Sequence, residues 1–214
     1  MKTTIYLVRH GQSLGNLNLQ MLGHTNLDLS ELGYRQAERT FEYLKDVHFD
    51  AVYSSPLKRA YNTILPHATY RGLTVQPLDA LREIYLGVWE GMYLADVLKR
   101  WPYTFTEIWR ANFGLCTPPK GEYVQDAATR CLDALTEIAE KHTGQTVLVG
   151  GHAGIFRAAC ARIAGIPPEC VGRDFQYMTN ASVTVLVYED GAFTMERYSD
   201  DAHLADIGTN LKGF

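Results

Sequence analysis

Nearly continuous apolar segments alternate with segments of helical periodicity along this chain. The strand-like segments are TIYLV (4–8), DAVYSS (50–55) and TVLVGG (146–151). The helical patterns span residues 30–45, 56–68, 121–142 and 153–165. Strands that are apolar on both faces lie between layers of helices, and helices are the usual connections between parallel strands. We therefore expect an α/β fold, a three-layer α/β/α sandwich around a mostly parallel sheet.

Local signals fix where some of these elements begin and end. Ser30 is a good N-cap for the first helix, and Pro56 is expected in the first turn of the second. LREI (81–84) resembles a short extended segment, and Gly165 is expected to end the last helix. Residues 182–198 form an expected hairpin, with Asp-Gly at its turn.

The length of 214 residues and the 46% hydrophobic content suit a single domain, expected to cover residues 1–214. Within it, residues 92–120 form an expected helical cap. The cap is rich in large rings: Trp101, Tyr103, Phe105, Trp109 and Phe113. Their main expected role is to pack the cap, and some of them are expected to line the mouth of a site and select an apolar leaving group.

The net charge of −4 argues against nucleic acid or an anionic membrane as partner. No apolar run reaches the roughly 18 residues of a membrane span. The four cysteines show no C-x-x-C spacing and are expected to be reduced thiols. We therefore expect a cytoplasmic protein; the hairpin edge could pair two copies into a homo-oligomer.

Charged and polar residues follow the expected strands. Arg9, His10 and Gly11 follow the first strand, and His152 follows TVLVGG. Ser54 and Ser55 end the second strand, and Arg59 comes four residues later. Glu83 lies in LREI. In open parallel sheets ligands bind beyond the carboxyl ends of the strands. We therefore expect two histidines, two arginines and one glutamate to converge at one rim.

This set of side chains suits phosphoryl transfer through a histidine. Arg9 and Arg59 would hold the phosphate oxygens in bidentate geometry, and His10 would attack phosphorus. Gly11 would let the phosphate approach the backbone. His152 would donate to the equatorial oxygens, and Glu83 would protonate the leaving oxygen and later take a proton from water. No metal or other cofactor is required.

The same segments resemble the motifs of the histidine phosphatase superfamily, the phosphoglycerate mutase-like proteins. LVRHGQSLGN is similar to its opening motif, YSSPLKRAYNT to the segment with the second arginine, LREIYLGVWEG to the proton-donor segment and GGHAGIFR to the segment with the second histidine. All four occur in family order between residue 4 and about residue 190. The resemblance implies a phosphorylated histidine and metal-independent catalysis.

Within that family the resemblance favours a phosphatase, similar to broad-specificity bacterial phosphatases and α-ribazole phosphatases, acting on a small phosphorylated metabolite. A phosphoglycerate mutase is the alternative. Mutases of the family carry a longer insertion with a tandem arginine pair, whereas this chain has Arg110 followed by Ala111.

Three further residues are expected to contact the substrate. They are Asn16 of the opening motif, Gly23 through its backbone N–H, and Ala153 beside the second histidine. Leu22 stands where the family often has a hydroxyl residue.

Two hypotheses from other functional classes, a serine esterase and a non-catalytic binding protein, remain open from the sequence. GQSLG matches the G-x-S-x-G elbow of serine esterases, with Ser13 as nucleophile and His152 or His203 as base, although only one strand precedes it. A pocket of the same composition could also bind a phosphorylated ligand without turnover. A metal site built on His10 and His152 is disfavoured, because the two arginines would repel the cation.

Overall fold

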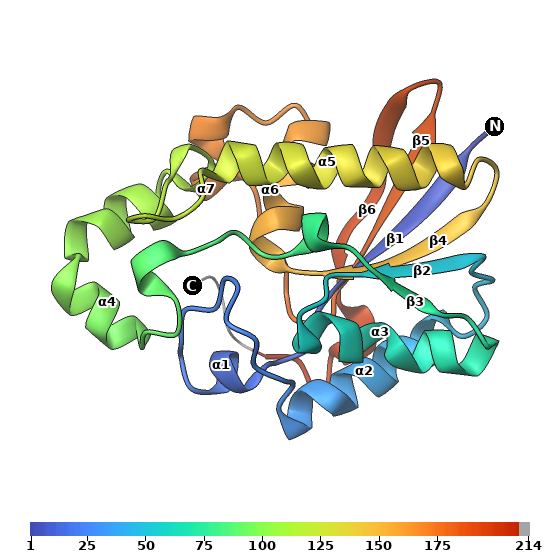
Figure 1. The fold of residues 1–214 in the computed structure, drawn as a ribbon, viewed down its shortest axis with the longest axis horizontal. Coiled ribbons are helices and arrows are strands. Elements are labelled where there is room, and N and C mark those ends of the chain that lie inside the picture. The colour runs from blue at the N-terminus through green and yellow to red at the C-terminus, as the bar shows by residue number, and fades with distance from the viewer. Residues whose placement is uncertain (210–214) are drawn as a thin grey trace.

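The computed structural model describes residues 1–209, which form a six-stranded mixed sheet (Figure 1). The strands are β1 (Thr3–Arg9), β2 (Ala51–Ser54), β3 (Val75–Pro77), β4 (Thr146–Gly151), β5 (Val183–Glu189) and β6 (Ala192–Asp200). Their order across the sheet is β3-β2-β4-β1-β5-β6. The first four are parallel neighbours, and β5 pairs antiparallel with both β1 and β6. The prediction of a mostly parallel sheet is confirmed.

Helices cover both faces of the sheet. The α-helices of residues 1–209 are α1 (Leu14–Leu17), α2 (Glu31–Leu44), α3 (Lys58–Arg71), α4 (Leu94–Arg100), α5 (Val124–Lys141), α6 (Ala153–Ile163) and α7 (Val171–Asp174). The pair α5 and α6 lies over one face, and the pair α2 and α3 lies over the other (Figure 1). The three-layer α/β/α arrangement is the one that the sequence predicts.

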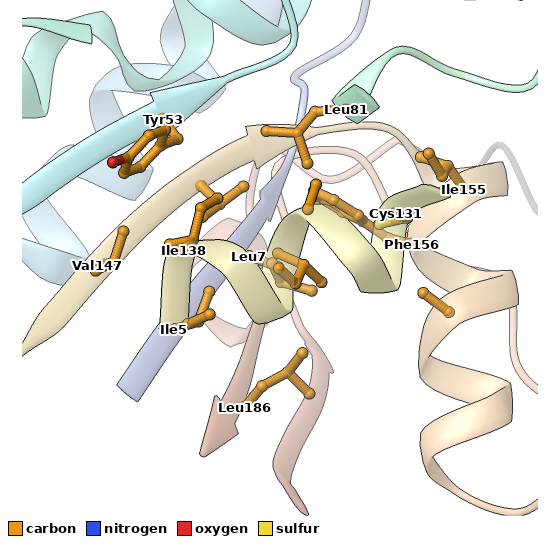
Figure 2. Close-up of a cluster of buried hydrophobic side chains, with 14 of the residues drawn as sticks. Ile5, Leu7, Tyr53, Leu81, Cys131, Ile138, Val147, Ile155, Phe156 and Leu186 are labelled. Carbon is orange, nitrogen blue, oxygen red and sulfur yellow. The ribbon is translucent and has the colours of Figure 1, made fainter. Parts of the chain in front are cut away.

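Alternating side chains of the central strands fill two cores. Leu7 and Val147 belong to the core under α5 and α6 (Figure 2), where Phe156 packs. Their chain neighbours Val8 and Leu148 belong to the core under α2 and α3. Because successive strand residues point to opposite faces, a strand between two helical layers is apolar at nearly every position.

The cap and turn signals are largely confirmed. Ser30 is the N-cap of α2, and its Oγ accepts from the Gly33 N–H at 3.1 Å. The hairpin turn has positive φ at Asp190 and Gly191, and Gly165 follows α6 with φ 70°. Pro56 is a correction, because α3 begins at Lys58 with Leu57 as N-cap, so the proline lies before the helix.

The chain between β2 and α4 differs from the expectation. The edge strand β3 was not predicted, and its three residues include Pro77, which an edge position tolerates. LREI forms no strand: Leu81 ends a 3₁₀ turn (Asp79–Leu81), and the following residues run irregularly.

Residues 92–120 contain α4, a wide helical segment (Thr104–Arg110) and a short 3₁₀ turn (Phe113–Leu115). Trp109 and Phe113 share a hydrophobic cluster with Trp89 and Phe105. The domain prediction runs to residue 214, and its last five residues lie outside the described part of the chain. Within residues 1–209 no helix has the length and apolar character that crossing a membrane requires.

Candidate active site

The carboxyl ends of β1, β4 and β2 meet at one rim of the sheet, because these strands are parallel neighbours. Arg9 ends β1 opposite Gly151, and His152 follows β4 directly. The rings of His10 and His152 have their centroids 5.3 Å apart. The structure therefore brings the two histidines together, as the strand-end argument predicts.

The ring of His10 is held by its own neighbour in the chain. Its Nδ1 lies 2.6 Å from the Gly11 carbonyl oxygen, which can only accept, so Nδ1 carries the proton and Nε2 keeps its lone pair. Burial, followed by the charges of Arg59 and Arg9, holds the pKa of His10 well below its usual value. His10 is therefore a neutral imidazole at neutral pH, which is the form that can act as a nucleophile.

His152 is held by Ser55 at one ring nitrogen. The Ser55 Oγ lies 2.8 Å from Nε2 of His152, and a hydroxyl can either donate to that nitrogen or accept from it. Nδ1 has no partner among the described residues, so it is the ring nitrogen left for a ligand. Burial and the charge of Arg59 keep the pKa of His152 well below its usual value. His152 is thus a neutral imidazole with one ring nitrogen that the described residues do not engage.

Two buried guanidinium groups flank the histidines. Arg9 and Arg59 are 2% and 1% exposed. Arg59 donates to the carbonyl oxygens of Thr25 at 2.7 Å and Gly23 at 2.8 Å. Burial lowers the pKa of both arginines, that of Arg59 to about 10, so both are charged at neutral pH. Arg9 donates to the Met178 carbonyl, and its Nε has no partner within the described residues.

Glu83 is seated on the N-terminus of α6. Its Oε2 accepts from the Gly154 N–H at 2.9 Å, and its Oε1 accepts from Ile155 at 2.8 Å and Ile84 at 3.0 Å. The first N–H groups of a helix lack intrahelical partners and favour a carboxylate. Because α6 starts directly after His152, the same helix positions both the carboxyl group and the second histidine.

A reaction pocket of about 580 Å³, counting the space open to solvent, lies beside these groups. Its lining residues are Arg9, His10, Asn16, Gln20, Met21, Leu22, Glu83, Ile84, Leu86, Trp109, Phe113, Ala153, Gly154 and Tyr177. Of the five predicted catalytic residues, Arg9, His10 and Glu83 line this cavity directly. His152 lies against His10, and Arg59 contacts the loop of residues 22–25.

Two of the three residues predicted to contact the substrate line the pocket, and the third does not. Asn16 lines the pocket, and its Oδ1 accepts from Ser13 and Asn180, which leaves Nδ2 as its free donor among the described contacts. Ala153 also lines the pocket, at the first position of α6. Gly23 does not line it; its carbonyl holds Arg59.

The reason for the glycine after His10 also differs from the expectation. A Cβ on Gly11 would lie 2.6 Å from the carbonyl oxygen of Gly33 in α2. Gly11 is therefore required by close packing of the loop against α2, and it is not among the residues that line the pocket.

Sequence reasoning missed the residue that organises the loop under Arg59. The carboxylate of Glu90 accepts from the N–H groups of His24 and Thr25, each at 2.8 Å, and from that of Leu86 at 3.0 Å. It also accepts from the Thr25 hydroxyl. The sequence signal that could have indicated this role was an acidic residue between Trp89 and Gly91. Ser55 was noticed at a strand end, but nothing in the sequence indicated its contact with His152.

Ser13 is unsuited to the esterase role. It is fully buried, and its Oγ caps α1 by accepting from the Asn16 N–H at 3.1 Å. Among residues 1–209 there is also no group of three or more His, Cys, Asp or Glu side chains placed to hold a metal ion.

Fold and site together define an α/β enzyme of the phosphatase type, with neutral histidines and buried arginines around its pocket. The chain belongs to the histidine phosphatase superfamily (branch 1), whose family model matches residues 5–201. The family resemblance in the sequence motifs is thereby confirmed.

Individual relatives agree with this assignment. The chain is 35% identical to a metal-independent phosphoserine phosphatase of Arabidopsis thaliana, over 99% of this chain and 87% of that protein. It is 32% identical to a 2,3-bisphosphoglycerate-dependent phosphoglycerate mutase of Methylorubrum populi, over 80% of this chain and 84% of the mutase. The structure of Bacillus stearothermophilus YhfR superposes with a TM-score of 0.88 at 31% identity, covering 94% of this chain and 99% of that one.

Proposed function

We propose that the protein hydrolyses phosphomonoesters of small metabolites through a phosphohistidine on His10. The observation that carries this proposal is the pair of adjacent neutral histidines. His10 has its lone pair on Nε2, because Nδ1 donates to the Gly11 carbonyl, and Nδ1 of the adjacent His152 has no partner among the described residues. In the tautomer with its proton on Nδ1, His152 donates to a phosphate oxygen while His10 attacks phosphorus.

In the first step Nε2 of His10 attacks phosphorus, and the bond from phosphorus to the leaving oxygen breaks. Glu83, in its protonated form, gives that oxygen its proton. Arg9, Arg59 and the Nδ1–H of His152 stabilise the charge on the three remaining oxygens.

In the second step Glu83 removes a proton from water, which attacks phosphorus. The bond between phosphorus and Nε2 breaks, inorganic phosphate forms and His10 returns to its neutral state. The positive charge that holds the phosphate is supplied throughout by the two guanidinium groups.

A mutase would run the same first step and return the phosphoryl group to a second hydroxyl. The relationship to a phosphoglycerate mutase keeps that candidate in view. We favour hydrolysis, because the cap offers Arg110 followed by Ala111 where mutases of the family carry an arginine pair. Phosphoserine is the first metabolite to try, since the Arabidopsis relative is named for it. We also infer a cytoplasmic setting, which the free thiols of the four cysteines suit.

The test is rapid-quench labelling with a substrate that carries a labelled phosphoryl group. The wild type should show acid-labile label on the protein and release inorganic phosphate, and His10→Ala should do neither. Ser13→Ala serves as control for the esterase alternative. Label that persists in His10→Ala would refute the proposal, binding without label or turnover would indicate a phosphate-binding protein, and label recovered in an isomeric ester would indicate the mutase.

A further inference from the structure

The chain around Glu83 is irregular and lacks the regular hydrogen bonds of a strand or helix. Residues 82–86, between Leu81 and the 3₁₀ turn Gly87–Trp89, belong to no strand or helix. Backbone carbonyl groups in such a segment need hydrogen-bond donors from elsewhere in the protein. The position of Glu83 therefore depends on groups outside its own segment.

One arginine of α5 supplies these donors. Nη1 of Arg130 donates to the carbonyl oxygens of Ala80 and Arg82, each at 2.8 Å, and Nη2 donates to that of Glu83 at 3.0 Å. The three carbonyl groups lie within four consecutive residues. A single planar side chain therefore holds the main chain up to and including Glu83.

Glu122, just before α5, holds the guanidinium group of Arg130 in turn. Its Oε1 accepts from Nε of Arg130 at 2.7 Å, and its Oε2 accepts from Nη2 at 2.8 Å. With these two bonds all five N–H groups of Arg130 have an acceptor. Glu122 also accepts from the Tyr85 N–H at 3.1 Å, so the ion pair contacts the chain on both sides of Glu83.

The carboxyl group of Glu83 is held separately, by the first turn of α6. It accepts from the N–H groups of Gly154 and Ile155, which have no acceptor within their own helix. Arg130 thus fixes the main chain of Glu83, and α6 receives its side chain. A shift of the main chain would move the carboxyl group relative to both α6 and the reaction pocket.

We propose that Arg130 is a positioning residue for the proton transfer made by Glu83, acting through the backbone carbonyl groups of residues 80–83 and held in place by Glu122. The inference rests on the proposed function, in which Glu83 protonates the leaving oxygen. Arg130 is not among the residues that line the reaction pocket, so its effect on the reaction passes through Glu83.

The first arm of the test compares kcat on glycerol 2-phosphate, whose leaving oxygen needs a proton, with kcat on p-nitrophenyl phosphate, whose leaving group needs none. Arg130→Lys keeps the charge but cannot supply five donors in the same plane. It should lower the ratio of the two kcat values roughly tenfold, with KM little changed, because rate falls steeply when a catalytic group is misplaced. A loss of folded protein alone would lower both rates equally and leave the ratio unchanged.

Arg71→Lys is the matched control. Nη2 of Arg71 donates to three backbone carbonyl groups within residues 44–47, none of which lines the reaction pocket, so this variant loses the same kind of contact elsewhere. It should leave the ratio as in the wild type. Glu122→Gln keeps the backbone bonds of Arg130 and should lower the ratio less than Arg130→Lys does; if Arg130→Lys does not fold, Glu122→Gln decides by the same measurements.

A double variant tests whether the effect passes through Glu83. In a Glu83→Gln protein the proton donor is already lost, so adding Arg130→Lys should not lower the ratio further. A further fall of the ratio in that background would overturn the inference.

The second arm measures amide hydrogen exchange by NMR and requires no turnover. The Glu83 carboxylate protects the amides of Gly154 and Ile155, so Arg130→Lys should speed their exchange relative to amides in the middle of α6, and Arg71→Lys should not. Unchanged exchange at both amides, or an ester ratio no lower than that of Arg71→Lys, would overturn the inference. A wild type that hydrolyses neither ester counts against the proposed function, and the exchange arm then decides whether Arg130 positions the Glu83 carboxyl group.

Discussion

Ser55 engages Nε2 of His152, and the Gly11 carbonyl accepts from Nδ1 of His10. Each ring therefore has one nitrogen engaged by the protein and one left for the ligand. Neutral imidazole is maintained in both residues, because burial and the nearby arginines depress their pKa. Protonation of either ring should require a pH well below the ordinary histidine range.

Ser55→Ala should lower kcat by roughly tenfold to a hundredfold with little change in KM, because the ring of His152 loses its only side-chain hydrogen-bond partner among the described residues. Steady-state kinetics on p-nitrophenyl phosphate measures this split. Ser54→Ala is the matched control: Ser54 is equally buried, and its hydroxyl reaches the Gly150 carbonyl at 3.5 Å and not the histidine. Equal effects of the two substitutions would show that Ser55 has no special role.

Glu83→Gln should reduce kcat on alkyl phosphates by about a hundredfold or more and should be less harmful on p-nitrophenyl phosphate, whose leaving group needs no proton. The amide also cannot accept from Gly154, Ile155 and Ile84 together, so a loss of about 1–3 kcal/mol in stability is expected. Comparing kcat on both classes of ester with a melting curve separates the two effects. Similar losses on both classes would exclude Glu83 as the proton donor.

At the scale of elements, α3 serves the site at one end and the core at the other. Arg59 lies in its first turn, and His67 lies two turns later, where it is buried. His67 is fully buried between Phe41 and Phe49, with ring centroids 5.4 and 6.0 Å away. Neither ring nitrogen has a partner among the described residues. Burial, with the charge of Arg71, lowers the pKa of His67 to about 4.

This burial makes stability depend on pH. The unfolded chain takes up a proton at His67 near pH 6.5, whereas the folded protein does so near pH 4, so stability present at neutral pH is lost as the pH falls between these values. The loss from this residue is roughly 3 kcal/mol. His67→Leu should remove that part and should raise the melting temperature at pH 5 relative to the wild type. His48→Gln, on an exposed histidine, should leave the pH dependence intact; equal pH slopes in His67→Leu and the wild type would contradict the argument.

Elements with a strong local pattern could be predicted from the sequence. The strands β1, β2 and β4 are apolar on both faces, and the hairpin carries its turn in Asp190 and Gly191. The strand β3 has three residues and a proline, which is too short for any periodicity to be seen. The start of α3 was misplaced because Leu57 is buried in an extended conformation, a tertiary effect that Pro56 does not reveal.

The residues of the site likewise divide into those that the sequence could predict and those that it could not. Residues at strand ends follow from the parallel sheet, which is why Arg9, His10 and His152 could be placed together in advance. The contacts of Glu90 and Ser55 depend on how loops fold back over several dozen residues. No local pattern encodes such contacts.

At the scale of the whole molecule, the rim of the sheet holds two buried guanidinium groups in a chain of net charge −4. Arg9 and Arg59 are covalent parts of the chain, so the field that holds a phosphate does not depend on a dissociable ion. Prolonged treatment with EDTA should therefore leave kcat/KM unchanged. A zinc-dependent phosphatase treated in parallel is the control, and recovery of lost activity on adding a divalent metal would contradict the proposed mechanism.

The cap lies between Glu83 and His152 in the chain, and it contributes Trp109 and Phe113 to the pocket wall but none of the groups assigned to bond making or breaking. Substitutions in the cap can therefore exchange aromatic rings or arginines, while the reacting groups keep their positions. Divergence among descendants of such a chain should accumulate in what is admitted to the pocket, and the chemistry performed there should be inherited intact.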